Sequence, residues 1–174
     1  MGQVYQTDLW RDLFVMLGTS AAALLGLLFV ATSIHLDEIT KDFSYRTRAL
    51  NNSYMLIFTM VEAIIVLTPQ PIELLSGSLV VANLAIIWIP IRNTYLYGYK
   101  NRDVGHRGGW ALWRGVGYLL ALTIGIAGGA LTLHSPNVGL YLITVSCGAL
   151  LVIVALNSWS VLLGIGQMEQ KIKT

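Results

Sequence analysis

Glu62 is the ionisable side chain that lies deepest within a long apolar segment, six residues before Thr68. A charged group inside a membrane is costly, so an acid there faces a bundle interior or a water-filled cavity and is a functional candidate by default. Rings of acidic side chains give cation selectivity when several copies surround a pore. We therefore expect Glu62 to serve a proton or cation pathway. The alternative is a protonated Glu62 that holds helices together by hydrogen bonds.

Polar residues recur at two depths in the predicted helices. Hydroxyls near the depth of Glu62 can donate to its carboxylate, and those of Ser20 and Ser78 are candidates. A second level nearer the inner face contains Asn83 and Asn157. The two levels could be linked along one helix face, because the eleven residues from Asn51 to Glu62 make almost three turns. The predicted ion pathway therefore contains Glu62, Asn83, Asn157, Ser20 and Ser78.

Sequence features of enzymes are weak in this chain. Cys147 is the single cysteine, so a disulfide framework and a cysteine-based metal cage are excluded. His106 has no second His or Cys at metal-ligand spacing, and no combination of Ser, His and an acid suggests nucleophilic catalysis. We expect a non-enzymatic protein with no catalytic residue, no metal and no cofactor.

The composition places these residues in a membrane protein. Of the 174 residues, 55% are hydrophobic and 11% are charged, whereas about a quarter of the residues in a soluble domain are charged. About 20 apolar residues cross a bilayer as a helix. Five segments meet this length, so the predicted fold is a single all-α domain of five transmembrane helices at about 13–36, 49–68, 73–91, 113–134 and 138–163. Two prolines between the second and third segments predict a tight helical hairpin, with a re-entrant pair as the alternative.

The distribution of Lys and Arg predicts the orientation of these helices. Ten of the eleven cations fall in segments 37–48 and 92–114 and in the C-terminal tail, whereas Arg11 lies on the opposite side. Cytoplasmic segments carry the excess of positive charge. Five helices with an outside N-terminus and an inside C-terminus place these ten cations together. Trp10 and Tyr141 then fall at the outer interface, where aromatic side chains are favoured.

Small residues at helical spacing predict how the helices pack. Close backbone approach and interhelical hydrogen bonds drive association in lipid. The residues expected at helix contacts are Gly18, Ala22 and Gly26 on the first segment and Gly125 and Gly129 on the fourth. The contacting helix belongs either to the same chain or to a second copy, and we expect the protein to form homo-oligomers.

Segment 92–112 is predicted to be a basic cytoplasmic loop. Its cations alternate with aromatic residues, a composition suited to anionic lipid headgroups. The candidate headgroup contacts are Arg92, Lys100, Arg102 and Arg107. Orientation alone also explains this charge, so we expect membrane lipids and no nucleic acid as partners.

Residues 10–36 read WRDLFVMLGTSAAALLGLLFVATSIHL. This stretch resembles the opening of small bacterial multi-span membrane proteins, many of them uncharacterised and some labelled modulator of FtsH protease. The resemblance implies a multi-pass protein of the bacterial plasma membrane and carries no catalytic residue to this chain.

Two functions follow from these observations. The leading hypothesis is a small oligomeric, channel-like or ion-conducting protein with a polar path near Glu62. The alternative is a non-enzymatic regulatory or assembly subunit of another membrane complex, such as a membrane protease. A closed monomer with Glu62 hydrogen-bonded internally favours the alternative.

Overall fold

The computed structural model describes residues 8–41, 43–100 and 108–172, and the regular secondary structure of these residues is helical. Five of the helices are long and apolar enough to span a membrane, which confirms the number predicted from the sequence. The helices are α1 (Asp8–Ile34), α2 (Leu36–Lys41), α3 (Phe43–Leu67), α4 (Ile72–Lys100), α5 (Gly108–Thr132) and α6 (Pro136–Ile172).

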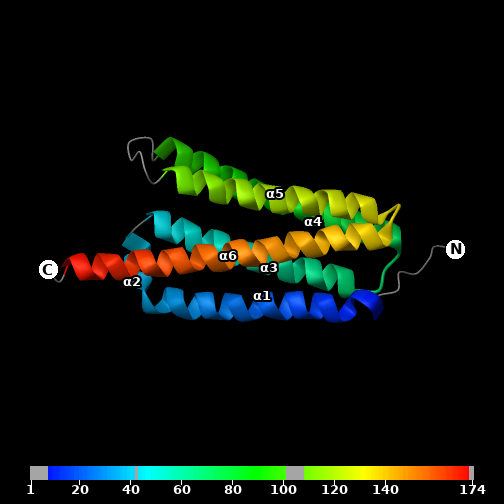
Figure 1. Ribbon diagram of the computed structural model, residues 1–174, viewed down its shortest axis with the longest axis horizontal. Helices are drawn as coiled ribbons and strands as arrows, with labels where there is room; N and C mark the ends of the chain where they lie inside the picture. Colours follow the sequence, from blue (N-terminus) through cyan, green and yellow to red (C-terminus); the bar gives the residue numbers. More distant parts are fainter. Residues whose placement is uncertain (1–7, 42, 101–107, 173–174) are drawn as a thin grey trace.

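The five long helices lie side by side along one direction (Figure 1). α5 packs extensively against both α4 and α6, and α3 contacts α4 and α6, so these four helices form a bundle. α1 packs mainly against α3 and has a smaller contact with α6. The short helix α2 follows the end of α1 and contacts both α3 and α1. The helix bearing Glu62, α3, therefore has neighbours on several sides.

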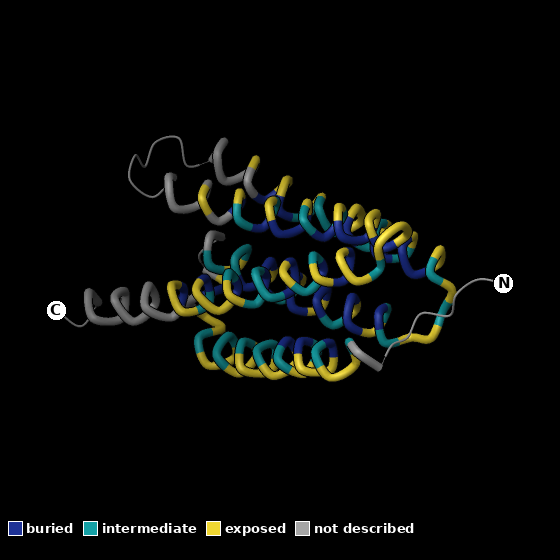
Figure 2. Tube along the Cα trace, turned by 45° about the vertical axis from the view of Figure 1, so that its right-hand side comes forward, coloured by how far each residue is buried: buried dark blue, intermediate teal, exposed yellow. Residues whose placement is uncertain are grey.

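Burial follows the inner faces of the helices, as Figure 2 shows. One apolar cluster includes Phe14, Ala63 and Cys147, and a second includes Met55 and Leu122. The outer faces also carry large apolar side chains. An apolar exterior of this kind is unusual for a soluble monomer and suits a lipid environment. Exposed examples are Leu27, Phe29, Leu84, Trp88, Leu120, Val152 and Leu156.

The helices begin and end at different residues from those predicted. The largest difference is in segment 92–112, because α4 continues to Lys100 and α5 begins at Gly108. The predicted loop therefore contains helix at both ends, while residues 101–107 lie outside the described residues. Charged and aromatic residues end the apolar part of a helix without ending the helix itself. The apolar part of α4 extends from Ile72 to Asn93.

Segment 37–48, expected to be a cytoplasmic connection, also contains helix. α1 ends at Ile34, His35 forms a turn, and α2 and the first residues of α3 follow. Ile39 of α2 is buried against Val161 of α6, which gives this short helix an apolar contact. The connection is therefore partly packed onto the bundle.

The proline-containing joint separates α3 from α4. Gln70 Nε2 donates a hydrogen bond to the carbonyl of Ile65 at 2.7 Å, and this bond satisfies one acceptor in the last turn of α3. Both helices are long enough to cross a membrane, as the hairpin interpretation requires. The joint positions Glu62 of α3 opposite the middle of α4.

Candidate functional site

Glu62 lies on the inner face of α3 with a relative exposure of 0%. Its two carboxyl oxygens have different partners. Asn83 Nδ2 of α4 donates to Oε1 at 2.7 Å, and Cys147 Sγ of α6 donates to Oε2 at 3.1 Å. The Glu62 side chain thus connects α3 with two other helices.

Asn83 has one polar atom with a partner and one without. Its Nδ2 also donates to the carbonyl of Leu79 at 3.0 Å, one turn earlier on α4. Its Oδ1 is buried and forms no hydrogen bond within the described residues. Leaving a buried acceptor unpaired costs about 1–3 kcal/mol. The Glu62–Asn83 pair therefore contains an unused acceptor.

Gly125 of α5 makes room for the Asn83 carboxamide. A Cβ added to Gly125 would collide with Asn83 Oδ1 and would lie 3.0 Å from Ser146 Oγ of α6. Ser146 in turn donates to the carbonyl of Ala121 at 2.7 Å. The absence of a side chain at Gly125 therefore lets α5 approach the polar atoms of α4 and α6.

The other small residues predicted on α5 and α1 have varied surroundings. A Cβ on Gly129 would lie 3.0 Å from Val80 Cγ2 of α4, and one on Gly18 would lie 3.2 Å from Ala63 Cβ of α3. Ala22 is exposed, and no atom lies within 4 Å of the Cβ position of Gly26. Gly18 thus faces the bundle, whereas this chain leaves Ala22 and Gly26 uncovered.

The two hydroxyls expected to donate to Glu62 are not its partners. Ser78 Oγ donates to the carbonyl of Leu75 at 2.9 Å, and the nearby Ser76 Oγ donates to the carbonyl of Gly129 at 2.8 Å. Ser20 on α1 is half-buried and is not among the hydrogen-bond partners found for Glu62. A backbone carbonyl one turn away is a nearby acceptor for a helical serine. The hydrogen-bond donors to Glu62 are therefore an amide and a thiol and not these hydroxyls.

Asn52 is the centre of a second buried polar cluster. Its Oδ1 accepts from Tyr118 Oη at 2.9 Å and from Asn157 Nδ2 at 2.8 Å. Its Nδ2 donates to Ser158 Oγ at 2.9 Å. These bonds join α3 to α5 and α6. On the other side of α3, Asn51 Oδ1 accepts from Asn93 Nδ2 of α4 at 3.1 Å.

The two polar clusters are separated by apolar packing, in contrast to the stripe expected on α3. Met55 and Phe58 lie between Asn51 and Glu62 on the predicted face, and both are buried in an apolar cluster. Asn83 is also at the level of Glu62 and not at that of Asn157. The direct hydrogen bond from its amide to Glu62 Oε1 assigns Asn83 to the Glu62 cluster.

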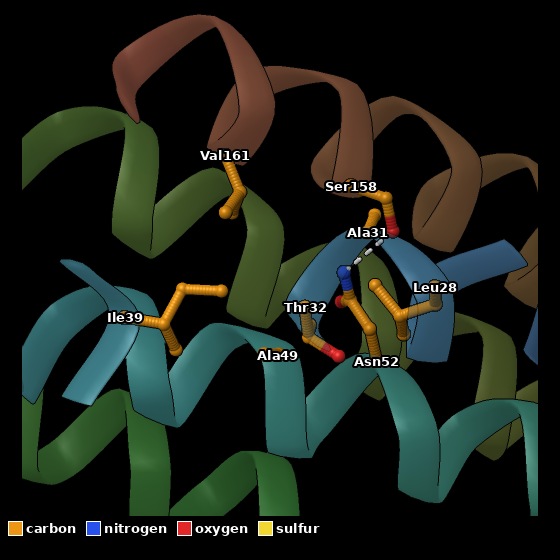
Figure 3. A pocket seen from close by; sticks show the side chains of 8 residues that line it. All are labelled: Leu28, Ala31, Thr32, Ile39, Ala49, Asn52, Ser158 and Val161. Atoms are coloured by element: carbon orange, nitrogen blue, oxygen red, sulfur yellow. Dashed lines mark hydrogen bonds between the residues drawn. The ribbon is translucent and has the colours of Figure 1, made fainter. Parts of the chain in front are cut away.

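A small pocket adjoins the Asn52 cluster, between α1, α2, α3 and α6. Its volume of about 10 Å³ is close to the minimum for one water molecule. Figure 3 shows the Asn52–Ser158 hydrogen bond at its wall. The pocket is lined by Leu28, Ala31, Thr32, Ile39, Ala49, Asn52, Ser158 and Val161.

The lipid-headgroup candidates are only partly described. Arg92 is exposed on α4. Lys100 is the last residue of α4, and Arg102 and Arg107 lie outside the described residues. Trp10 and Tyr141, expected at one interface, are neighbours with ring centroids 6.0 Å apart in an edge-on arrangement. In the described ranges, no three or more His, Cys, Asp or Glu side chains are grouped to hold a metal.

Two partners at these sites are not predicted from the sequence. Cys147 is considered only as the single cysteine, and Tyr118 is not placed in a polar cluster. The available signal applies to Tyr118, because Gly125 and Tyr118 are seven residues apart and share a helix face. Gly125 was expected at a helix contact, but not as the space for a specific amide.

Comparison of the chain with protein-family models, with curated proteins and with solved structures finds no match. The functional argument therefore depends on the geometry described above.

Proposed function

We propose that this protein is a non-enzymatic regulatory or assembly subunit of another complex in the bacterial plasma membrane. The observation that carries the proposal is the enclosure of Glu62. Its side chain is fully buried, and both carboxyl oxygens accept hydrogen bonds from neighbouring helices of the same chain. An acid in this state stabilises a bundle without contacting a solute.

The packing between the polar clusters supports the same function. A solute moving from the Glu62 cluster to the Asn52 cluster within one copy would have to displace buried apolar side chains. Met55, Leu56 and Leu122 have exposures of 0–1% and belong to one apolar cluster. Protein interiors are packed as densely as organic crystals, so this layer opposes a continuous polar path.

In the proposed topology, five helices cross the membrane with the N-terminus outside. The beginning of α3 and the end of α4 then lie on the cytoplasmic side, where positive charge is in excess. Arg46 and Arg92 are exposed in these regions. This placement makes Arg92 a candidate contact for anionic lipid headgroups.

The uncovered part of α1 is the proposed contact with the partner complex. Ala22 is exposed and Gly26 has open space around it, while Leu17 and Ala21 on the other face are buried. Small side chains allow another helix to approach the backbone closely in lipid. We assign this face to a transmembrane helix of a different protein, and a second copy of the chain is the competing occupant.

Site-specific photo-crosslinking in membranes tests this assignment. A photoreactive residue at Ala22 should capture a distinct membrane protein, whereas the same residue at exposed Leu84 of α4 should not. The captured protein should co-purify with the wild type and be lost with Gly26→Leu, which fills open space without a clash. Capture of a second copy would support the predicted homo-oligomer and contradict the assigned partner. Lipid adducts alone at both positions would contradict a protein contact.

Ion conduction by an assembly of copies is the second candidate function. Asn83 Oδ1, the unpaired acceptor in the Glu62 cluster, favours it, because a buried acceptor can bind a cation or a water molecule. Conduction would require the buried apolar side chains between the two polar clusters to move apart. The two functions predict different ion fluxes in vesicles.

A further inference from the structure

The hydrogen bonds of the Glu62 site are incomplete at one atom. Asn83 Oδ1 is buried without a donor, although its own amide nitrogen bonds to Glu62. We propose that Glu62 and Asn83 form a proton-binding site, in which Glu62 takes up one proton and shares it with Asn83 Oδ1. This inference does not rest on the proposed regulatory function.

The surroundings of Glu62 favour a proton over a larger ligand. The neighbouring residues Ala63, Leu79 and Cys147 are 0–2% exposed and belong to one apolar cluster. The space beside Gly125 is already filled by the Asn83 carboxamide. The small pocket described above lies at the Asn52 cluster. A proton is the ligand that binds without added volume.

Neighbouring helices present mainly neutral groups to this site. α4 contributes the Asn83 amide, α6 the Cys147 thiol and α5 the backbone at Gly125. α1 packs nearby with Phe14, Leu17 and Gly18. Cys147 is the titratable neighbour, and within the described residues no Lys, Arg or His forms an ion pair with Glu62. A carboxylate without a cationic partner in a dry interior is costly, and protonation removes that cost.

A rotation of the Asn83 carboxamide accommodates the proton. In the arrangement described, Asn83 Nδ2 donates to Glu62 Oε1. A half-turn of the amide exchanges Nδ2 and Oδ1 with little change in shape. The new O–H bond of Glu62 then donates to Asn83 Oδ1, and Nδ2 turns toward the Gly125 side, where Ser146 Oγ lies.

The exchange is balanced, because the proton comes from water and no electrons are transferred. The rotated Nδ2 gives up its bonds to Glu62 Oε1 and to the Leu79 carbonyl. The O–H bond from Glu62 to Asn83 Oδ1 replaces the first, and the Leu79 carbonyl still accepts the helical backbone bond. In return, the acceptor that was unpaired gains a donor. Protonation of Glu62 on α3 is thereby coupled to the contact between α4 and α5.

Infrared pH titration of the protein in phosphatidylcholine vesicles tests the proposal. Above about pH 6, where exposed Asp and Glu carboxyl groups are ionised, the wild type should show a carboxylic-acid C=O band that grows as the pH falls. The band should be absent in Glu62→Gln, whose amide imitates the protonated acid, and should persist in Glu73→Gln, which alters an exposed acid at the beginning of α4. Within this pH range, absence of the band from the folded wild type, or its persistence in Glu62→Gln, would overturn the site.

Two further variants test whether Asn83 shares the proton. Asn83→Leu should shift the band to higher frequency, because the acid loses its acceptor. Gly125→Ala should shift it in the same direction by displacing the carboxamide, whereas Gly77→Ala, at a glycine with nothing within 4 Å, should leave it unchanged. If Asn83→Leu prevents folding, Gly125→Ala decides the result. An unshifted band in a folded Gly125→Ala protein would contradict sharing.

Discussion

The amide oxygen of Asn83 on α4 occupies the space that a Cβ on Gly125 of α5 would require. The same carboxamide donates to Glu62 of α3 through its nitrogen. Gly125 of α5 therefore leaves the space in which Asn83 of α4 can bond to Glu62 of α3. Gly125, which the small-residue spacing of α5 predicts at a helix contact, therefore accommodates one specific side chain.

Gly125→Ala should destabilise the bundle by about 1–3 kcal/mol, the usual cost of overfilling a packed site. The added methyl group must displace either the Asn83 carboxamide or α5 itself. Thermal unfolding in detergent, followed by circular dichroism, measures the effect. Gly77→Ala is the matched control, because its added methyl meets open space and alanine favours a helix by about 1 kcal/mol over glycine. Equal unfolding midpoints for the two variants would contradict the role of Gly125.

Glu62→Ala should cost more stability than Glu62→Gln. Alanine leaves the buried donors of Asn83 and Cys147 without their acceptor, a loss of about 1–3 kcal/mol. Glutamine keeps the shape and an acceptor for one of them. Denaturation curves of the two variants give their free energies of unfolding, which are then compared. Equal free energies of unfolding for Glu62→Ala and Glu62→Gln would contradict this role of Glu62 as an acceptor.

Cys147 should be inert to water-soluble maleimides in the folded protein, because the thiol is fully buried against Glu62. We expect labelling at least about tenfold slower in vesicles than after unfolding in SDS, since the reagent requires local opening. His134→Cys in a Cys147→Ser background provides an exposed control between α5 and α6. Rapid labelling of native Cys147 would show that the cluster is open.

The same His134→Cys protein tests the orientation. His134 lies at the end opposite the excess of Lys and Arg, so we expect an impermeant maleimide added to intact cells to label it. Tyr95→Cys on α4, exposed near the opposite end, should be labelled only after the membrane is permeabilised. The reverse pattern would invert the proposed topology.

Asn52→Leu should destabilise the second cluster by about 2–3 kcal/mol, because Tyr118, Asn157 and Ser158 lose a shared partner. Tyr118→Phe removes the hydrogen bond donated to Asn52 Oδ1 and the one accepted from Asn157 Nδ2, and in a membrane protein each such bond averages about 0.6 kcal/mol. Unfolding in detergent ranks these variants. Asn137→Leu, at an exposed position, is the control and should change stability by less than about 0.5 kcal/mol. An Asn52→Leu protein as stable as this control would contradict the network.

The sequence predicted the elements of this fold better than their connections. Long uncharged runs identified the five long helices, because hydrocarbon length and hydropathy are local properties. The continuation of α4 past Arg92 was missed, since charge marks the limit of the apolar part and not of the helix. Glu62 could be identified as a buried acid from one segment. Its partners could not, because Asn83 and Cys147 lie 21 and 85 residues away and their approach depends on packing between helices.

Ion flux in vesicles containing the purified protein tests the central claim most directly. Proton and potassium flux would be measured for the wild type, for Glu62→Gln and for protein-free vesicles. Because Glu62 is enclosed and the two polar clusters are separated by apolar side chains, we predict the same background flux in all three. A flux above background in the wild type that is lost in Glu62→Gln would contradict the account and establish Glu62 as part of a pathway.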